Sequence, residues 1–196
     1  MTEVLGHHRY AAAGCDVGAL VTGQLGHKYA DELYGIHIGS GQKLTLFNGA
    51  DSPAGMLAWI LQRWASWSAG DDVEVVFPRD DLLTHATIYW ATSSIGTSVR
   101  TYANNNRYPW TPAHDRWPVV EAPTGITFVA HENPPGVTTD QRVEHFLGSD
   151  RADWYNIINT TAHDRGGHFI PWEIPEEWVA DLQRTFRGRR GSRKAW

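Results

Sequence analysis

The stretch RYAAAGCDVGALVTGQLGHKYADELYGIHI, residues 9–38, decides the fold class of this chain. Residues 9–15 are mostly small and run through a glycine, as expected for a buried strand that enters a tight turn. Between Val17 and Leu33 apolar residues recur at helical spacing, and residues 34–38 read as a second short strand. Strand, sharp turn, helix and strand form the βαβ unit of a parallel sheet, so this segment predicts an α/β protein.

The rest of the chain divides into a helical middle and a second α/β region. Pro53 begins a predicted helix that ends near Ser68, and another predicted helix runs from Asp80 to about residue 105. A polar connection is expected up to Pro123. Beyond it we expect strands and helices to alternate, over residues 125–130, 138–147, 155–162 and 175–186. These patterns predict a core segment at 1–49, a helical lid segment at 50–120 and a C-terminal core segment at 121–196.

The composition is that of an ordinary globular domain, since 41% of the residues are hydrophobic and 20% are charged. The net charge of −5 gives no reason to expect nucleic acid or an anionic membrane as a partner. No run approaches the roughly 20 apolar residues that span a bilayer. The single cysteine, Cys15, cannot form an internal disulfide, which favours a reducing cytoplasm. His163 and His168 lack the spacing of a helical zinc pair, and we predict neither a metal nor a cofactor.

Three polar residues each follow a predicted strand, where ligands of doubly wound α/β sheets bind. Asp16 is the centre of GCDVG, residues 14–18, which has the small-x-Asp-x-small spacing of a nucleophile elbow. Glu132 and His168 follow the two strands of the C-terminal region. Taken singly, Asp16 also suits a helix N-cap, Glu132 a surface loop and His168 a structural role. Together they have the order nucleophile, acid, histidine of α/β-hydrolases, with the helical middle where that fold inserts a lid.

An aspartate nucleophile restricts the classes of reaction that the site could catalyse. A carboxylate is a poor acyl acceptor, but its attack on a saturated carbon gives an alkyl ester that water can hydrolyse. Epoxides and haloalkanes are the natural electrophiles. In this hypothesis His168 activates the water, Glu132 orients and stabilises the imidazolium, and the Val17 N–H is one candidate oxyanion donor.

Four long runs, which cover most of the chain, carry a resemblance to a known family: residues 9–40, 51–68, 80–104 and 123–173. In these runs the chain resembles epoxide hydrolases of the microsomal-like branch, particularly those of actinobacteria. The resemblance implies an α/β-hydrolase fold with Asp16 as nucleophile, Glu132 as charge-relay acid and His168 as base. It also implies that Tyr102 is a lid tyrosine that protonates the oxygen of a small apolar epoxide. The alternative for Tyr102 is a core or rim tyrosine.

The chain also departs from that family. Its members usually have a further half-sheet before the elbow, with a His-Gly-x-Pro loop, whereas only some fifteen residues precede Asp16 here. The passage from Ser40 to Asp51 is shorter than the family's lid and lacks its second tyrosine. We therefore expect the C-terminal portion of the fold with a shortened lid, an unpaired sheet edge, and weak or no activity of the isolated chain. A homodimer or a separate N-terminal segment would then be the partner.

Two other functions stay open at this point. A haloalkane dehalogenase shares the aspartate nucleophile, but Val17 in place of tryptophan and the presence of Tyr102 argue against it. A non-catalytic binding module that kept this part of the fold would explain the missing oxyanion loop.

Overall fold

The computed structural model describes residues 6–15, 17–39, 53–70, 72–104, 107 and 111–189. The elements follow the predicted α/β order, with four strands, the α-helices and short 3₁₀ turns in this part of the chain. Their bounds are β1 Tyr10–Gly14, α2 Val17–Lys28, η1 Ala30–Glu32, β2 Leu33–Gly39, α3 Pro53–Trp67, α4 Val73–Val76, α5 Arg79–Ala91, α6 Ile95–Asn104, β3 Val120–Val129, η2 Ala130–Glu132, α7 Thr139–Leu147, η3 Ala152–Trp154, β4 Tyr155–His163, α8 Ile170–Glu173 and α9 Pro175–Phe186.

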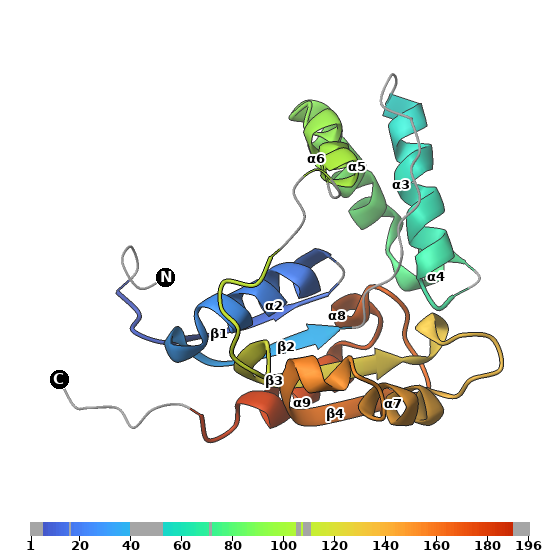
Figure 1. Cartoon of the computed structure of the whole chain (residues 1–196). Helices are drawn as coiled ribbons and strands as arrows, with labels where there is room; N and C mark the ends of the chain where they lie inside the picture. The colour runs from blue at the N-terminus through green and yellow to red at the C-terminus, as the bar shows by residue number, and fades with distance from the viewer. Residues whose placement is uncertain are drawn as a thin grey trace. The chain divides into compact units, whose positions relative to one another are not determined.

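The chain forms two compact units. One unit comprises Met1–Gln42 and Pro112–Trp196, and the other comprises Lys43–Thr111. The first unit holds the sheet, and the second holds the helices α3 to α6 (Figure 1). The functional division into core and lid at residues 49 and 120 stays a prediction.

The sheet has four parallel strands in the order β1-β2-β3-β4. Neighbouring residues of one strand point to opposite faces, so their packing partners show which helix covers which face. Phe128 packs against Phe146 of α7, whereas Val129 packs against Trp178 of α9. In the same way Ile36 lies beside Gly26 of α2, and His37 contacts Trp178. Helices α2 and α7 therefore cover one face and α9 the other, as expected for an α/β sandwich (Figure 1).

Two apolar clusters hold these layers together. On the α2 face the buried core consists of Leu33, Ile36, Val120 and Ala122. On the α9 face it consists of Val129, Ile170, Ile174 and Trp178. Because Val120 and Ala122 are needed for the first cluster, β3 begins at Val120, five residues earlier than predicted. The prediction of a polar connection up to Pro123 was wrong there.

The second unit has its own core, made by Met56, Ile60, Ala86 and Ile95. The predicted single helix from Asp80 to about residue 105 is two helices, α5 and α6, separated at Thr92–Ser94. Ser93 has φ 52°, and the Thr92 hydroxyl donates to the Ile88 carbonyl at 2.7 Å. Such local side-chain bonds compete with helix continuation, and hydrophobic spacing alone does not reveal them.

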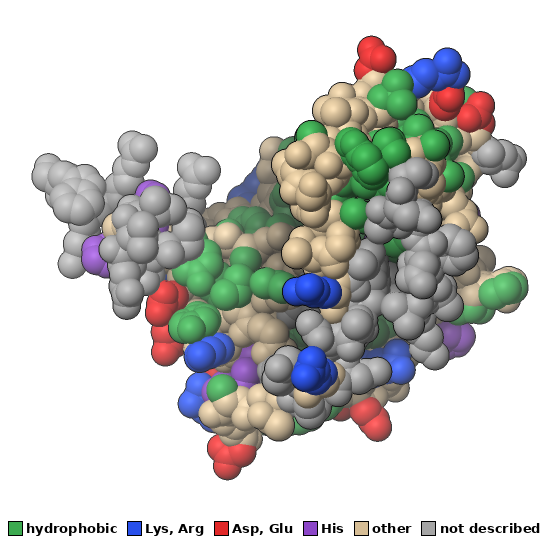
Figure 2. All heavy atoms as spheres, turned by 90° about the horizontal axis from the view of Figure 1, so that it is seen from above, with side chains coloured by type: hydrophobic (Ala, Val, Ile, Leu, Met, Phe, Trp, Pro, Cys, Tyr) green, Lys and Arg blue, Asp and Glu red, His purple; other side chains and the backbone are tan. Residues whose placement is uncertain are grey.

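Apolar side chains also reach the surface of the molecule. Val75, Leu83, Ile88 and Trp90 of the second unit are exposed, and Figure 2 shows hydrophobic side chains interleaved with charged ones on the face it presents. Among the helices that the structure describes, none combines the length and the hydropathy that a bilayer-spanning segment requires.

Candidate active site

The segment around the predicted nucleophile has the expected strand–turn–helix form. Strand β1 ends at Gly14, and α2 begins at Val17. Gly14 is required by close packing, since a Cβ there would overlap the carbonyl oxygen of Gly18 and lie 2.8 Å from Thr22 Oγ1. Asp16 itself lies outside the described residues, so its role as nucleophile stays a prediction. Val17 is the first residue of α2, and its role as an oxyanion donor is likewise a prediction.

The structure brings Glu132 and His168 together. Nδ1 of His168 lies 3.0 Å from Oε1 of Glu132, and the two residues are only 7% and 6% exposed. Glu132 ends the 3₁₀ turn after β3, and His168 lies five residues after the end of β4. Since a carboxylate only accepts hydrogen bonds, the imidazole donates from Nδ1, and the neutral ring therefore carries no proton on Nε2.

Glycines shape the loop that carries His168. Gly166 has φ +87°, and a Cβ on it would lie 3.1 Å from Ile174. The His131 N–H donates to the Gly166 carbonyl at 3.1 Å, which ties this loop to the turn that carries Glu132. Gly166, the first of the two predicted glycines, therefore allows the bend that places His168 beside the acid.

A further side chain beside Glu132, Arg142 of α7, was not predicted from the sequence. Its Nη2 lies 3.9 Å from Oε2 of Glu132, and its guanidinium stacks over the Phe128 ring at 5.3 Å. Burial lowers the pKa of Arg142, and the neighbouring Glu132 opposes that shift. Arg142 supplies positive charge beside a buried acid. Nothing in its sequence position, within a short amphipathic helix, marks it for this contact.

All four strands are parallel, so their carboxyl ends lie at one edge of the sheet. Glu132 and His168 follow β3 and β4 at this edge, and Asp16 follows β1 in the sequence. This is the arrangement expected for a ligand site of an open α/β sheet. Tyr102 belongs to α6 of the second unit, and its side chain is outside the described part. Its role as proton donor stays a prediction.

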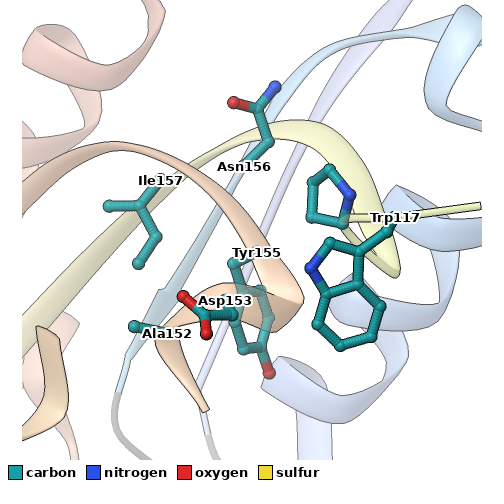
Figure 3. Close-up of a pocket in the computed structure, with 7 residues that line it drawn as sticks. Trp117, Ala152, Asp153, Tyr155, Asn156 and Ile157 are labelled. Atoms are coloured by element: carbon teal, nitrogen blue, oxygen red, sulfur yellow. The ribbon is translucent and has the colours of Figure 1, made fainter. Parts of the chain in front are cut away.

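The pocket in Figure 3 lies elsewhere. It has a volume of about 440 Å³ and is lined by Trp117, Pro118, Ala152, Asp153, Tyr155, Asn156 and Ile157. Tyr155 begins β4, so this pocket lies at the amino end of that strand, opposite to the end that leads to His168. We therefore do not assign it to the candidate active site. Within the described ranges, no three or more His, Cys, Asp or Glu side chains gather in a way that could hold a metal ion.

Comparison with solved structures defines the class of protein. The structure of juvenile hormone epoxide hydrolase from the silkworm Bombyx mori matches with a TM-score of 0.67 at 25% identity, over 96% of this chain and 52% of that chain. Aspergillus niger epoxide hydrolase matches with a TM-score of 0.66 at 19% identity, over 94% of this chain and 54% of that one. The chain therefore has the fold of the C-terminal part of an α/β-hydrolase, as predicted.

Sequence comparison then shows which proteins with an α/β-hydrolase fold this chain is similar to. No family model matches the chain. Juvenile hormone epoxide hydrolase of Bombyx mori is 28% identical over 176 residues, 81% of this chain and 35% of that protein. Epoxide hydrolase 1 of Oryctolagus cuniculus is 30% identical over 139 residues, 67% of this chain and 29% of that protein. A putative epoxide hydrolase of Stigmatella aurantiaca is 25% identical over 95% of this chain and 49% of its own length.

These relatives confirm the predicted resemblance to epoxide hydrolases. The chain spans between about a third and a half of their length.

Proposed function

We propose that this chain carries the catalytic elements of an epoxide hydrolase that acts on small apolar epoxides. The Asp16 carboxylate attacks one epoxide carbon, the carbon–oxygen bond breaks, and Tyr102 donates a proton to the leaving oxygen. The product is an alkyl ester on Asp16. Nε2 of His168 then takes a proton from water, and the resulting hydroxide attacks the ester carbonyl. The tetrahedral intermediate collapses, the imidazolium returns its proton to the leaving alkoxide to give the diol, and the proton left on the carboxyl group of Asp16 restores the phenol of Tyr102.

The observation that carries this proposal is the buried hydrogen bond between His168 and Glu132. An imidazole that accepts a proton during hydrolysis becomes a cation, and a buried carboxylate 3.0 Å away stabilises that cation. The bond also fixes the ring orientation and the tautomer, so that Nε2 is the basic nitrogen. The similarity to epoxide hydrolases supports the choice of an epoxide as electrophile.

The test separates ester formation from ester hydrolysis. Purified chain is incubated with styrene oxide, and the diol, free chloride from a chloroalkane, and the mass of the peptide that contains Asp16 are measured. Because the isolated chain is expected to be weakly active, we expect slow formation of diol without chloride release, and an ester adduct that accumulates on Asp16 in the His168→Gln variant. The control is His145→Gln, an exposed histidine of α7, which should turn over without an adduct.

Two outcomes would contradict the proposal. Chloride release without diol would indicate a dehalogenase. An Asp16 peptide that stays unmodified in His168→Gln, with no diol from the unaltered chain, would indicate a binding module.

We also propose a cytoplasmic location. The sequence has one cysteine, Cys15, and so forms no internal disulfide, as is usual for proteins of a reducing compartment. Recovery of the protein from the cytosolic fraction of its own cells would support this, and recovery from the membrane or secreted fraction would contradict it.

A further inference from the structure

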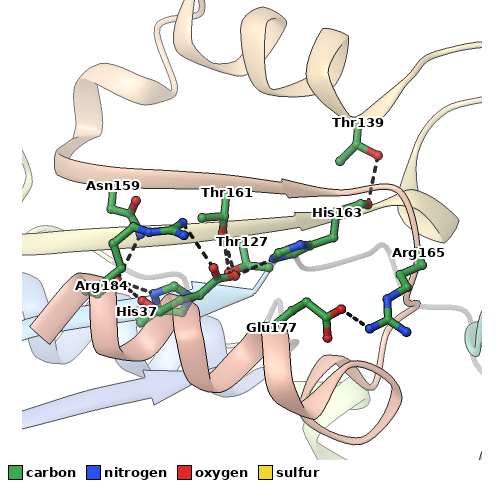
Figure 4. A network of polar contacts seen from close by, with 11 residues as sticks. His37, Thr127, Thr139, Asn159, Thr161, His163, Arg165, Glu177 and Arg184 are labelled. Atoms are coloured by element: carbon green, nitrogen blue, oxygen red, sulfur yellow. Dashed lines mark hydrogen bonds and ion pairs between the residues drawn. The ribbon is translucent and has the colours of Figure 1, made fainter.

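A buried carboxylate outside the candidate active site lies against the sheet near the carboxyl ends of β3 and β4. Asp181 of α9 is only 1% exposed. Its Oδ2 accepts hydrogen bonds of 2.8 Å from the hydroxyls of Thr127 and Thr161 and from Nε2 of His163 (Figure 4). Arg184 Nη1 lies 3.5 Å from the other oxygen. Burying a carboxylate costs several kcal/mol unless it is well paired, so this arrangement requires a structural reason.

The contacts extend across the sheet to His37 of β2. Nε2 of this fully buried histidine lies 2.8 Å from Thr127 Oγ1, and Nδ1 lies 2.8 Å from Thr185 Oγ1. The Thr127 hydroxyl has only one proton, and it donates that proton in its hydrogen bond to Asp181. Thr127 therefore accepts from His37 Nε2–H. On the other side of the ring Nδ1 lies beside the Thr185 hydroxyl, which itself donates to the Asp181 carbonyl at 2.9 Å. One connected set of hydrogen bonds thus joins β2, β3 and β4 to α9.

His163 connects this network to the loop of the catalytic histidine. It is the last residue of β4, and only four residues separate it from His168. Its side chain is held by Asp181, and its carbonyl accepts from the Thr139 hydroxyl at 3.2 Å. Further along the same loop, the carbonyl of Gly166 accepts from the His131 N–H. The loop is therefore anchored where it leaves β4 and again just before His168.

We propose that Asp181 is a positioning residue that acts through His163 to hold His168 in its hydrogen bond with Glu132. Asp181 does not contact the site, and Glu132 alone does not fix the short glycine loop that carries His168. A shift at the end of β4 is passed along this loop to the imidazole. The part of the inference that concerns turnover rests on the proposed function, whereas the part that concerns the position of His168 does not.

The test compares two variants that break the contact with one that does not. Asp181→Asn removes the charge, and His163→Phe removes the donor but keeps a ring and leaves Asp181 with both threonine donors. The control is Thr185→Val, which removes a buried hydroxyl one turn further along α9, on the side of His37. The readout is solvent exchange of the His168 Nδ1 proton, observed by ¹H NMR and assigned by its loss in His168→Gln.

We expect this proton to exchange at least ~10-fold faster in Asp181→Asn and His163→Phe, and within about twofold of the unaltered chain in Thr185→Val. If Asp181→Asn does not fold, His163→Phe decides alone. Unchanged exchange in His163→Phe, or an equal increase in all three variants, would overturn the proposal, because the network would then have only a general stabilising role.

Turnover of styrene oxide gives a second readout. A misplaced base should lower kcat by ~10-fold or more with KM nearly unchanged in the two contact variants, and not in Thr185→Val. Equal kcat in all variants would contradict the positioning role. If the unaltered chain forms no diol, the proposed function fails, whereas the proton exchange still decides the inference about Asp181.

Discussion

At the scale of single residues, the chemistry depends on how Glu132 is surrounded. It is buried, it accepts from His168, and the Arg142 guanidinium lies on its other side. A carboxylate in this position stabilises an imidazolium strongly, because little water competes for either charge. The ring of His168 is also fixed before substrate binds. Both effects belong to the hydrolytic half of the proposed reaction.

The first prediction is that Glu132→Gln slows ester hydrolysis without preventing ester formation. The amide keeps the shape of the side chain but no longer stabilises the imidazolium, so turnover should fall by ~100-fold or more. Rapid-quench mass analysis of the Asp16 peptide should show the ester accumulating. Glu144→Gln, an exposed acid of α7, is the matched control. Turnover of Glu132→Gln within a few-fold of the unaltered chain would be inconsistent with a charge-relay acid.

The second prediction concerns His37 and pH. Burial lowers the pKa of His37 from 6.5 to about 4, against the opposing effect of Asp181, so His37 is neutral in the folded chain. Between pH 6.5 and pH 4, His37 binds a proton more readily in the unfolded chain than in the folded chain. Protonation of His37 therefore favours unfolding as the pH falls. The contribution of neutral His37 to the free energy of unfolding is fully present above pH 6.5 and decreases towards pH 4. Between about pH 7 and 5 the free energy of unfolding should fall by about 2 kcal/mol.

Urea unfolding at these two pH values measures the effect. His37→Gln should be less stable at neutral pH, because the buried network loses a member, but its stability should change less with pH. Parallel curves for the two proteins would show that His37 does not titrate in this way.

At the scale of elements, the turn between β1 and α2 depends on the close approach of two backbone segments. Gly14 lies against the Gly18 carbonyl and the side chain of Thr22. A Cβ at Gly18, by contrast, would meet no atom within 4 Å. The two glycines of the GCDVG motif therefore have different effects. Gly14 permits close packing of the backbone, whereas Gly18 only makes the first turn of α2 more flexible.

The third prediction follows from this difference. Gly14→Ala should destabilise the chain by about 2 kcal/mol, because the methyl group overlaps backbone that cannot move freely. Gly18→Ala should be neutral or stabilising by up to about 1 kcal/mol, as for an exposed helical glycine. Urea midpoints of the two variants give the comparison. Equal destabilisation by both would contradict the packing that the structure shows.

At the scale of the whole molecule, the sheet has two edges among the described residues. β1 pairs only with β2, and β4 pairs only with β3. The β1 edge is also where the sequence resemblance predicts further strands. Edge strands with small, uncharged side chains such as those of β1 pair readily with other strands.

The fourth prediction is that the chain self-associates through β1. Sedimentation velocity should show a dimer that grows with concentration, and Ala11→Lys should shift the protein towards monomer, since Ala11 is exposed on β1 and charge blocks edge pairing. A monomer at every concentration would contradict the homodimer.

Most of the elements could be predicted locally. α9 begins at Pro175 and ends at Phe186 as predicted, because a proline start and an apolar stripe are both visible in sequence. Among the features missed are the break at Ser93, the early start of β3, the end of α2 at Lys28 instead of Leu33, and the contact of Arg142 with Glu132. Each depends on a side-chain hydrogen bond or on packing against a distant segment, and spacing along the chain does not encode these.

The sequence by itself determined the order of strands and helices and the placing of three polar residues after strand ends. These follow from local periodicity, from glycine and proline, and from the rule that parallel strands end at one edge. Only the tertiary structure decided that Glu132 and His168, 36 residues apart, share a hydrogen bond, and that Asp181 and His37 are linked through the Thr127 hydroxyl. The physical reason is burial. A polar side chain that is removed from water needs a hydrogen-bond partner, and that partner can come from any segment that folding brings close to it.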